Sequence, residues 1–165
     1  SELPKPFDHP LFAGLDEQLN RNLSNYLTRL QMSAAAIEKL QQVLFSGKRS
    51  VVLAHFGDHQ PSFDGLMMGL DPTAAAKALG DAHSVTYYML RGNQVTKEKF
   101  DYPVLDIGLL GGLILDVATI PKDAFFEANT RMRERCHGRY MDCGDAPLLE
   151  SYLSFLFNQL HVIER

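Results

Sequence analysis

Apolar residues recur at helical spacing near the start of the chain. Two stripes share this spacing: Leu23, Tyr26, Leu27 and Leu30, and then Ile37, Leu40, Val43 and Leu44. Spacings of three and four residues place side chains on one face of an α-helix. Ser33 is a typical N-cap for the second stripe, and Gly47 is a typical residue after a helix end. We therefore expect two consecutive helices, or one broken helix, over residues 20–46.

Two short apolar segments follow, and both are typical of β-strands. Residues 50–56 are nearly continuously apolar and end at Gly57, which is typical of a strand buried on both faces. Residues 84–90 form the second segment, which the polar residues 91–93 should end. A helix is expected between them, over residues 71–80. Two strands separated by a helix indicate a parallel crossover and an α/β fold.

The second half of the chain predicts three helices. The apolar stretch 104–120 falls short of the roughly 20 residues that span a bilayer. We expect it to form a buried helix over residues 104–118, with Gly111 and Gly112 allowing close helix packing. Pro121 should open the next helix, which runs to about residue 135. A final amphipathic helix should begin after Asp145 as its N-cap.

Two strands are too few for a stable α/β sheet, so either this chain has further strands or chain outside these residues completes the sheet. The sequence begins at Ser1 rather than Met, and residues 1–19 are a polar, proline-containing lead-in with no apolar signal segment. We therefore expect the chain to be part of a longer protein. Without the strands that complete it, the sheet would have an exposed edge. Such an edge can pair with a second copy of the chain, so a homodimer is one expected assembly.

The amino-acid composition indicates which classes of protein the chain could belong to. The chain has 165 residues, of which 45% are hydrophobic and 22% are charged, with a net charge of −4. These values are typical of a globular protein with a sizeable core. Nucleic-acid binding needs a clustered basic face, which this mildly acidic composition does not indicate.

Two cysteines lie in a segment rich in glycine and charge. Cys136 and Cys143 could close a small disulfide, which would fit an oxidising compartment. They could also remain free thiols, or bind a metal ion together with His137.

The candidate chemistry lies directly after the first strand, at Gly57-Asp58-His59. A carboxylate oxygen and an imidazole nitrogen together suit Zn²⁺ or Mn²⁺. Neighbouring residues of a regular strand face opposite ways, so both can reach one ion only where the strand breaks. Gly57 and Pro61 supply that break. An Asp-His pair arises by chance in about one chain in five of this length, so its position after a buried strand is the informative feature.

The segment VVLAHFGDHQP, residues 51–61, resembles the strand and GDH-x-P turn of the sulfatase and phosphoethanolamine/phosphoglycerol transferase group, in the alkaline phosphatase superfamily. Residues 86–90 and 104–120 also resemble a strand and a helix of that group. The resemblance implies a partial three-layer α/β/α sandwich. Residues 20–165 would then be the C-terminal half of a sulfatase-like catalytic domain, after the lead-in.

The resemblance also implies an incomplete metal site. Asp58 and His59 match the residues that bind a divalent cation in the group, which implies Zn²⁺ or Mn²⁺, with Ca²⁺ as a further candidate. No residue matches the nucleophile, which the group carries in its N-terminal half. The chain also departs from the group at Ser33, where an Asp is common nearby, and at Tyr87, where Pro is common. We therefore expect the missing N-terminal half to be the main partner and this chain alone to be inactive.

For the parent protein, the resemblance implies a membrane-anchored bacterial enzyme whose catalytic domain faces the periplasm. Its substrates would be phosphate or sulfate esters of envelope lipids or polysaccharides. The alternative is a noncatalytic α/β interaction module, in which Gly57-Asp58-His59 is only a turn.

Several other polar residues are weaker candidates. His55 is either a core histidine or a partner that orients the metal ligands. Arg91 and Asn93 follow the second strand and either approach an anionic substrate or lie in a solvated loop. His9 could contact substrate, and Asp64 could be a third metal ligand.

Overall fold

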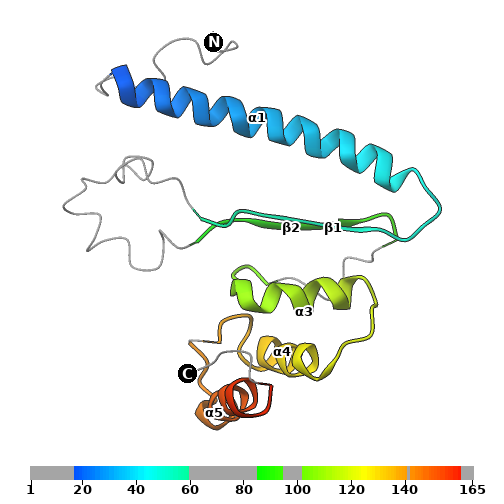
Figure 1. Ribbon diagram of the computed structural model, residues 1–165, viewed down its shortest axis with the longest axis vertical. Helices are drawn as coiled ribbons and strands as arrows, with labels where there is room; N and C mark the ends of the chain where they lie inside the picture. The colour runs from blue at the N-terminus through cyan, green and yellow to red at the C-terminus, as the bar shows by residue number, and fades with distance from the viewer. Residues whose placement is uncertain (1–16, 60–84, 95–101, 141, 161–165) are drawn as a thin grey trace. The chain divides into compact units, whose positions relative to one another are not determined.

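The computed structural model describes residues 17–59, 85–94, 102–140 and 142–160 (Figure 1). The chain divides into two units, one made of Ser1–Lys48 and His55–Met89, the other of Arg49–Ala54 and Leu90–Arg165. The helix expected over residues 71–80 lies outside the described residues, as do His9 and Asp64.

The first element is one long helix, α1 (Glu17–Phe45). The expected break at Ser33 is wrong, because the helix runs through this residue without interruption. The three alanines that follow Ser33 have the highest helix propensity of any residue, and they favour continuation over a new N-cap. The helix also begins earlier than expected, within the predicted lead-in. An ion pair of 2.7 Å between Glu17 and Arg21 lies in its first turn.

The apolar stripes predicted for α1 are only partly buried. Leu23 is buried, on a face that also carries the buried polar residues Asn20, Ser24 and Thr28. Leu40 and Val43, by contrast, are 46% and 72% exposed. Helical spacing therefore predicted the helix correctly, but not which of its apolar residues are covered.

Two strands, β1 (Val52–Phe56) and β2 (Tyr88–Gly92), form a two-stranded sheet. The backbone N–H of Gly57, after the end of β1, donates to the carbonyl of Tyr87, before the start of β2, at 3.0 Å. At the other end, the N–H of Val51 donates to Oδ1 of Asn93 at 3.0 Å. The end of one strand thus lies beside the start of the other, so the strands are antiparallel.

The expected parallel crossover is therefore wrong. An apolar run does not indicate in which direction its neighbour runs, and the long connection between β1 and β2 permits either direction. The expected burial of β1 on both faces is also wrong, because its residues are only half-buried and Phe56 is 45% exposed. The second strand also continues through Arg91 and Gly92, where the sequence predicted its end. The α/β/α sandwich stays a prediction, since the described residues contain this one sheet.

Three helices follow: α3 (Ile107–Val117), α4 (Ala124–Arg135) and α5 (Ala146–Ser154). A short π-helical segment, η3 (Phe155–Gln159), continues from α5. Helix α3 packs on α4, and α4 packs on α5. No helix in the described ranges is both long enough and apolar enough to cross a membrane.

The core of this helical part confirms the expected buried helix. Its fully covered side chains include Leu109 and Leu113 of α3 and Met132 of α4. Partly buried residues of the last helix, among them Leu148 and Tyr152, pack against the cluster around Leu109 and Met132.

Two adjacent glycines let α3 and α4 approach closely. A Cβ atom on Gly111 would lie 3.1 Å from the Phe126 ring, and one on Gly112 would lie 3.0 Å from Oδ1 of Asn129. Both distances are shorter than an ordinary van der Waals contact. The expectation that this glycine pair serves helix packing is confirmed.

The helix starts follow from local capping. The carboxylate of Asp123 accepts from the N–H of Phe126, so α4 begins after Asp123 rather than at Pro121, where the sequence predicted its start. The carboxylate of Asp145 accepts from the N–H of Leu148 at 3.1 Å, which confirms the predicted cap of α5.

The end of α4 has left-handed backbone at two consecutive residues. His137 and Gly138 have φ angles of 50° and 86°. The N–H of Gly138 donates to the carbonyl of Arg133 at 2.9 Å, which is the six-residue bond of a Schellman C-cap. A side chain is excluded at Gly138 in any case, because a Cβ there would lie 2.7 Å from the carbonyl oxygen of Val104.

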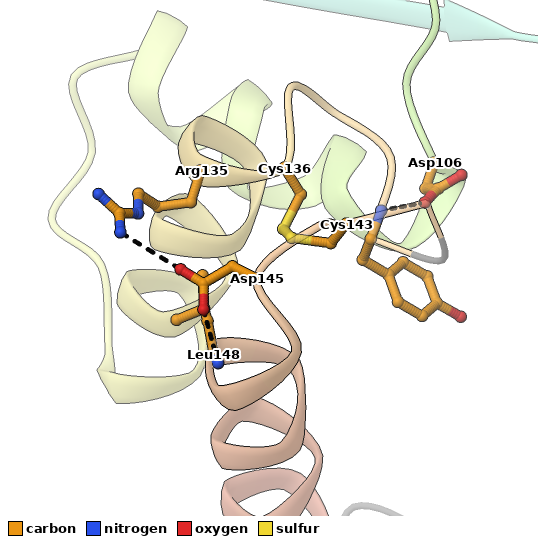
Figure 2. Close-up of a disulfide and its surroundings, with 7 residues drawn as sticks. Asp106, Arg135, Cys136, Cys143, Asp145 and Leu148 are labelled. Atoms are coloured by element: carbon orange, nitrogen blue, oxygen red, sulfur yellow. Dashed lines mark hydrogen bonds and ion pairs between the residues drawn. A yellow bond between two sulfur atoms is a disulfide. The ribbon is translucent and has the colours of Figure 1, made fainter.

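A disulfide joins Cys136, at the end of α4, to Cys143 (Figure 2). Of the three alternatives for these cysteines, the structure therefore has the disulfide. The same loop is tied to the start of α3: the backbone N–H of Tyr140 donates to Oδ2 of Asp106 at 2.7 Å, and the N–H of Asp106 donates to the carbonyl of Gly138 at 2.8 Å. The disulfide and these two hydrogen bonds fix the loop between α4 and α5.

Candidate metal-binding turn

The turn after β1 brings two candidate ligands together. Oδ2 of Asp58 and Nε2 of His59 lie 3.6 Å apart. Oδ1 of the same carboxylate accepts a hydrogen bond of 2.9 Å from the backbone N–H of His59. This bond fixes the carboxylate orientation and leaves Oδ2 facing the imidazole. Both side chains are open to solvent, with exposed fractions of 83% for Asp58 and 78% for His59.

This distance fits two ligands of one cation. Zinc binds nitrogen and oxygen at about 2.0–2.2 Å, so two ligand atoms on one tetrahedral ion lie roughly 3.4 Å apart. The separation of Asp58 Oδ2 and His59 Nε2 is close to that value. The adjacent side chains can converge because the regular strand has already ended at Phe56.

The site holds fewer ligands than a catalytic metal usually has. Within the four described ranges, no group of three or more His, Cys, Asp or Glu side chains could hold a metal ion. Catalytic zinc sites usually use three protein ligands and keep one position open. Asp58 and His59 alone are therefore fewer than the ligands that a catalytic metal site usually has.

The residues before β2 approach the backbone of Gly57 closely, where β1 has ended. A Cβ atom on Gly57 would lie 2.2 Å from Oγ1 and 3.3 Å from Cβ of Thr86, and 3.4 Å from the Tyr87 ring. A larger residue at this position would therefore require the Thr86 side chain to move. The glycine thus allows the residues before β2 to cover the backbone immediately before Asp58.

His55 contacts Tyr87, the residue immediately before β2. The hydroxyl of Tyr87 lies 3.4 Å from Nδ1 and 3.2 Å from Nε2 of His55, and the two ring centroids are 5.2 Å apart. The imidazole is half-buried. His55 therefore has a structural partner in Tyr87, and its role in orienting the metal ligands stays a prediction.

Arg91 and Asn93 lie toward the other end of the sheet. The pairing of Gly57 with Tyr87 and of Val51 with Asn93 places Arg91 opposite Leu53, five residues before Asp58. At about 3.4 Å per residue, that is roughly 17 Å along the strand. Asn93 instead bonds the backbone of Val51 and, through Nδ2, the carbonyl of Arg49 at 2.9 Å.

The described residues contain a second polar cluster, between α3 and α4. The carboxylate of Asp116 accepts from Lys122 at 2.5 Å and from the guanidinium of Arg133. Burial alone would raise the pKa of Asp116, but hydrogen bonds from Lys122 and Arg133 bring that pKa below its ordinary value of 3.8. Arg133 is only 2% exposed and Lys122 also bonds Thr130, so this cluster supports the helix packing.

Sequence reasoning missed the two residues that contact the turn region from the other strand, Thr86 and Tyr87. It expected a parallel pairing, in which these residues would start their strand far from Asp58. The glycine before Asp58 was the one available signal, because a glycine at a strand end often marks a close backbone approach.

Comparison with known proteins gives one relative in the bacterium Haemophilus influenzae, an uncharacterized protein. It is 31% identical over 141 residues, which make up 85% of this chain and 25% of the relative. The chain thus spans about a quarter of the length of the relative that it matches. No family model matches the chain. No solved structure matches it either.

Proposed function

We propose that the chain is the C-terminal part of a metal-dependent, sulfatase-like hydrolase or phospho-group transferase. The observation that carries this proposal is the pairing of Asp58 Oδ2 and His59 Nε2 at 3.6 Å, directly after a β-strand. The resemblance of residues 51–61 to the GDH-x-P turn of that group of enzymes supports the same assignment.

In this proposal Asp58 and His59 hold a divalent cation, Zn²⁺ or Mn²⁺, with Ca²⁺ as a further candidate. Such an ion, when bound, polarises a phosphoryl or sulfuryl oxygen and lowers the pKa of a nucleophile. Asp58 supplies negative charge, while its second oxygen keeps the turn closed through the N–H of His59. His59 binds as the neutral imidazole, with Nε2 toward the ion.

The remaining ligands and the nucleophile come from the rest of a longer polypeptide. The Haemophilus influenzae relative supports this arrangement, because three quarters of its length lie outside the matched region. The same missing half would add strands to β1 and β2, since a sheet of two strands is only marginally stable in water. The isolated chain would then bind metal weakly and be inactive.

The substrates in this proposal are phosphate or sulfate esters, carried by lipids or polysaccharides of the bacterial cell envelope. The parent enzyme would be anchored in the inner membrane, with this part facing the periplasm. The disulfide between Cys136 and Cys143 supports that location, because disulfides persist in oxidising compartments such as the periplasm.

The test compares the full-length wild-type protein with Asp58→Ala by metal analysis and by phosphatase and sulfatase assays. We expect Asp58→Ala to lose bound metal and roughly 100-fold or more of the activity. Asp142→Ala is the matched control, since Asp142 is an exposed aspartate that pairs with Arg139 on the surface. Equal metal content and activity in wild-type protein and Asp58→Ala would overturn the proposal and favour the noncatalytic interaction module.

The isolated chain provides a second test, of its expected partners. An uncovered edge of the sheet formed by β1 and β2 can pair with a second copy. We expect light scattering to show dimers of the isolated chain. Adding the separately expressed N-terminal half should replace these dimers with a one-to-one complex. If the isolated chain is a monomer that does not bind the N-terminal half, the proposed completion of the sheet is contradicted.

A further inference from the structure

We infer that Thr86 is a positioning residue for the metal site at Asp58 and His59. This inference rests on the proposed function, because it assigns a role at that site. Thr86 lies on the segment that leads into β2, whereas both ligands follow β1. Nothing in the sequence motif itself indicates that this threonine and the ligands belong together.

The first observation is the close approach of Thr86 to the backbone. Its Oγ1 lies 2.2 Å from the point where a Cβ of Gly57 would be. With a carbon–carbon bond of about 1.5 Å, Oγ1 is therefore no more than about 3.7 Å from the Cα of Gly57. At that separation the hydroxyl oxygen can accept a weak hydrogen bond from the Cα–H group.

The second observation is the hydrogen bond at the same glycine. The N–H of Gly57 donates to the carbonyl of Tyr87 at 3.0 Å. Gly57 is thus approached both by the backbone of Tyr87 and by the side chain of Thr86. As a glycine, residue 57 has no side chain of its own that could take the place of these contacts.

These contacts fix the direction in which the chain leaves β1. Asp58 is the next residue, so a small rotation at Gly57 changes where its carboxylate points. The two ligand side chains are largely exposed. Residues that orient metal ligands typically change metal affinity by about 10- to 100-fold when they are replaced.

The experiment measures the dissociation constant for Mn²⁺ in the full-length protein by calorimetry. Thr86→Val keeps the β-branched shape but replaces the hydroxyl with a methyl group, and we expect about tenfold weaker binding. Thr86→Ser keeps the hydroxyl, and we expect binding within about twofold of wild type. Asp142→Ala is the matched control, because it removes an exposed carboxylate that pairs with Arg139 instead.

Two results would overturn the inference: Thr86→Val binding Mn²⁺ as wild type does, or Thr86→Ser binding as weakly as Thr86→Val. Asp58→Ala separates this outcome from failure of the proposed function. If Asp58→Ala loses binding while Thr86→Val keeps it, only the role of Thr86 is wrong. If Asp58→Ala binds as wild type does, or if wild type binds none of Mn²⁺, Zn²⁺ and Ca²⁺, both proposals are wrong.

A double-mutant cycle tests the contact without relying on metal. Gly57→Ala introduces the Cβ that would collide with Oγ1 of Thr86, whereas Thr86→Ala removes that oxygen. We expect Gly57→Ala to lower the melting temperature more in the wild-type background than in the Thr86→Ala background. An equal drop in both backgrounds would show that the two residues do not interact.

Discussion

The guanidinium of Arg133, almost completely buried in α4, donates a hydrogen bond to the carboxylate of Asp116 on α3. Lys122 bonds the other oxygen of the same carboxylate. One carboxylate therefore compensates two cations in the packed part of the chain. Removing its charge would leave both cations without this counterion.

Asp116→Asn should consequently destabilise the chain. The substitution keeps the size of the side chain but removes the charge that faces a buried arginine, for which a cost of about 3 kcal/mol is expected. Urea unfolding followed by circular dichroism measures this difference. Asp142→Asn, which removes an exposed partner of Arg139, should cost less than about 1 kcal/mol. A similar cost for both variants would contradict the importance of the buried cluster.

The ion pair between Asp116 and Arg133 also predicts how the stability of the folded chain depends on pH. Burial raises the pKa of Asp116, but the hydrogen bonds from Lys122 and Arg133 outweigh it and lower the pKa from 3.8 in the folded chain. A lowered pKa stabilises the folded state above the unfolded-state value, and that stabilisation is lost as the pH falls through the folded-state value. The stability difference between wild type and Asp116→Asn should therefore be constant at neutral pH and shrink below pH 3.8. A difference that grows on acidification would contradict this account.

Glycine substitutions in α3 test the helix packing. A Cβ on Gly112 would lie 3.0 Å from Asn129 and 3.4 Å from Nη1 of Arg133, both buried. Gly112→Ala should cost about 1–3 kcal/mol through overpacking. Gly108 is in the same helix, but a Cβ there meets nothing within 4 Å. Gly108→Ala should be neutral or stabilising by up to about 1 kcal/mol, because alanine favours helix. Equal effects of the two variants on urea unfolding would argue against the close approach of α4.

The disulfide provides a further prediction. Joining Cys136 and Cys143 closes a loop with a sequence separation of 7, which restricts the unfolded chain. The entropic model gives a stabilisation of about 2 kcal/mol for a loop of this size. The double substitution Cys136→Ser/Cys143→Ser should lose this amount in urea unfolding, and a reducing agent should destabilise only the wild type. Insensitivity of the wild type to reductant would contradict a formed disulfide.

Local signals in the sequence predicted much of the helical part. Asp145 caps α5 as expected, because an N-cap bond involves only neighbouring residues. The glycine pair of α3 serves packing as expected. Ser33 failed as a cap signal, since the alanines after it support an uninterrupted helix equally well. Such competing local preferences leave the continuity of a helix undecided.

Long-range pairing was harder to predict. The apolar character of β1 does not indicate the direction of β2, so the antiparallel arrangement could not be predicted from either segment. That error also affected the site. In a parallel pairing, Arg91 would lie at the same end of the sheet as Asp58, whereas the observed register brings Thr86 to Gly57. The ligand pair itself was predictable, because Asp58 and His59 are adjacent and depend only on the local turn.

The most direct test of the central claim, that Asp58 and His59 share one cation, is pulsed electron paramagnetic resonance of Mn²⁺ bound to the full-length protein. This measurement detects directly bound imidazole nitrogen. We predict that His59→Gln removes one nitrogen coupling, whereas His55→Gln, which changes the other histidine at this end of β1, leaves all couplings intact. An unchanged spectrum in His59→Gln would contradict the metal-binding role of this turn.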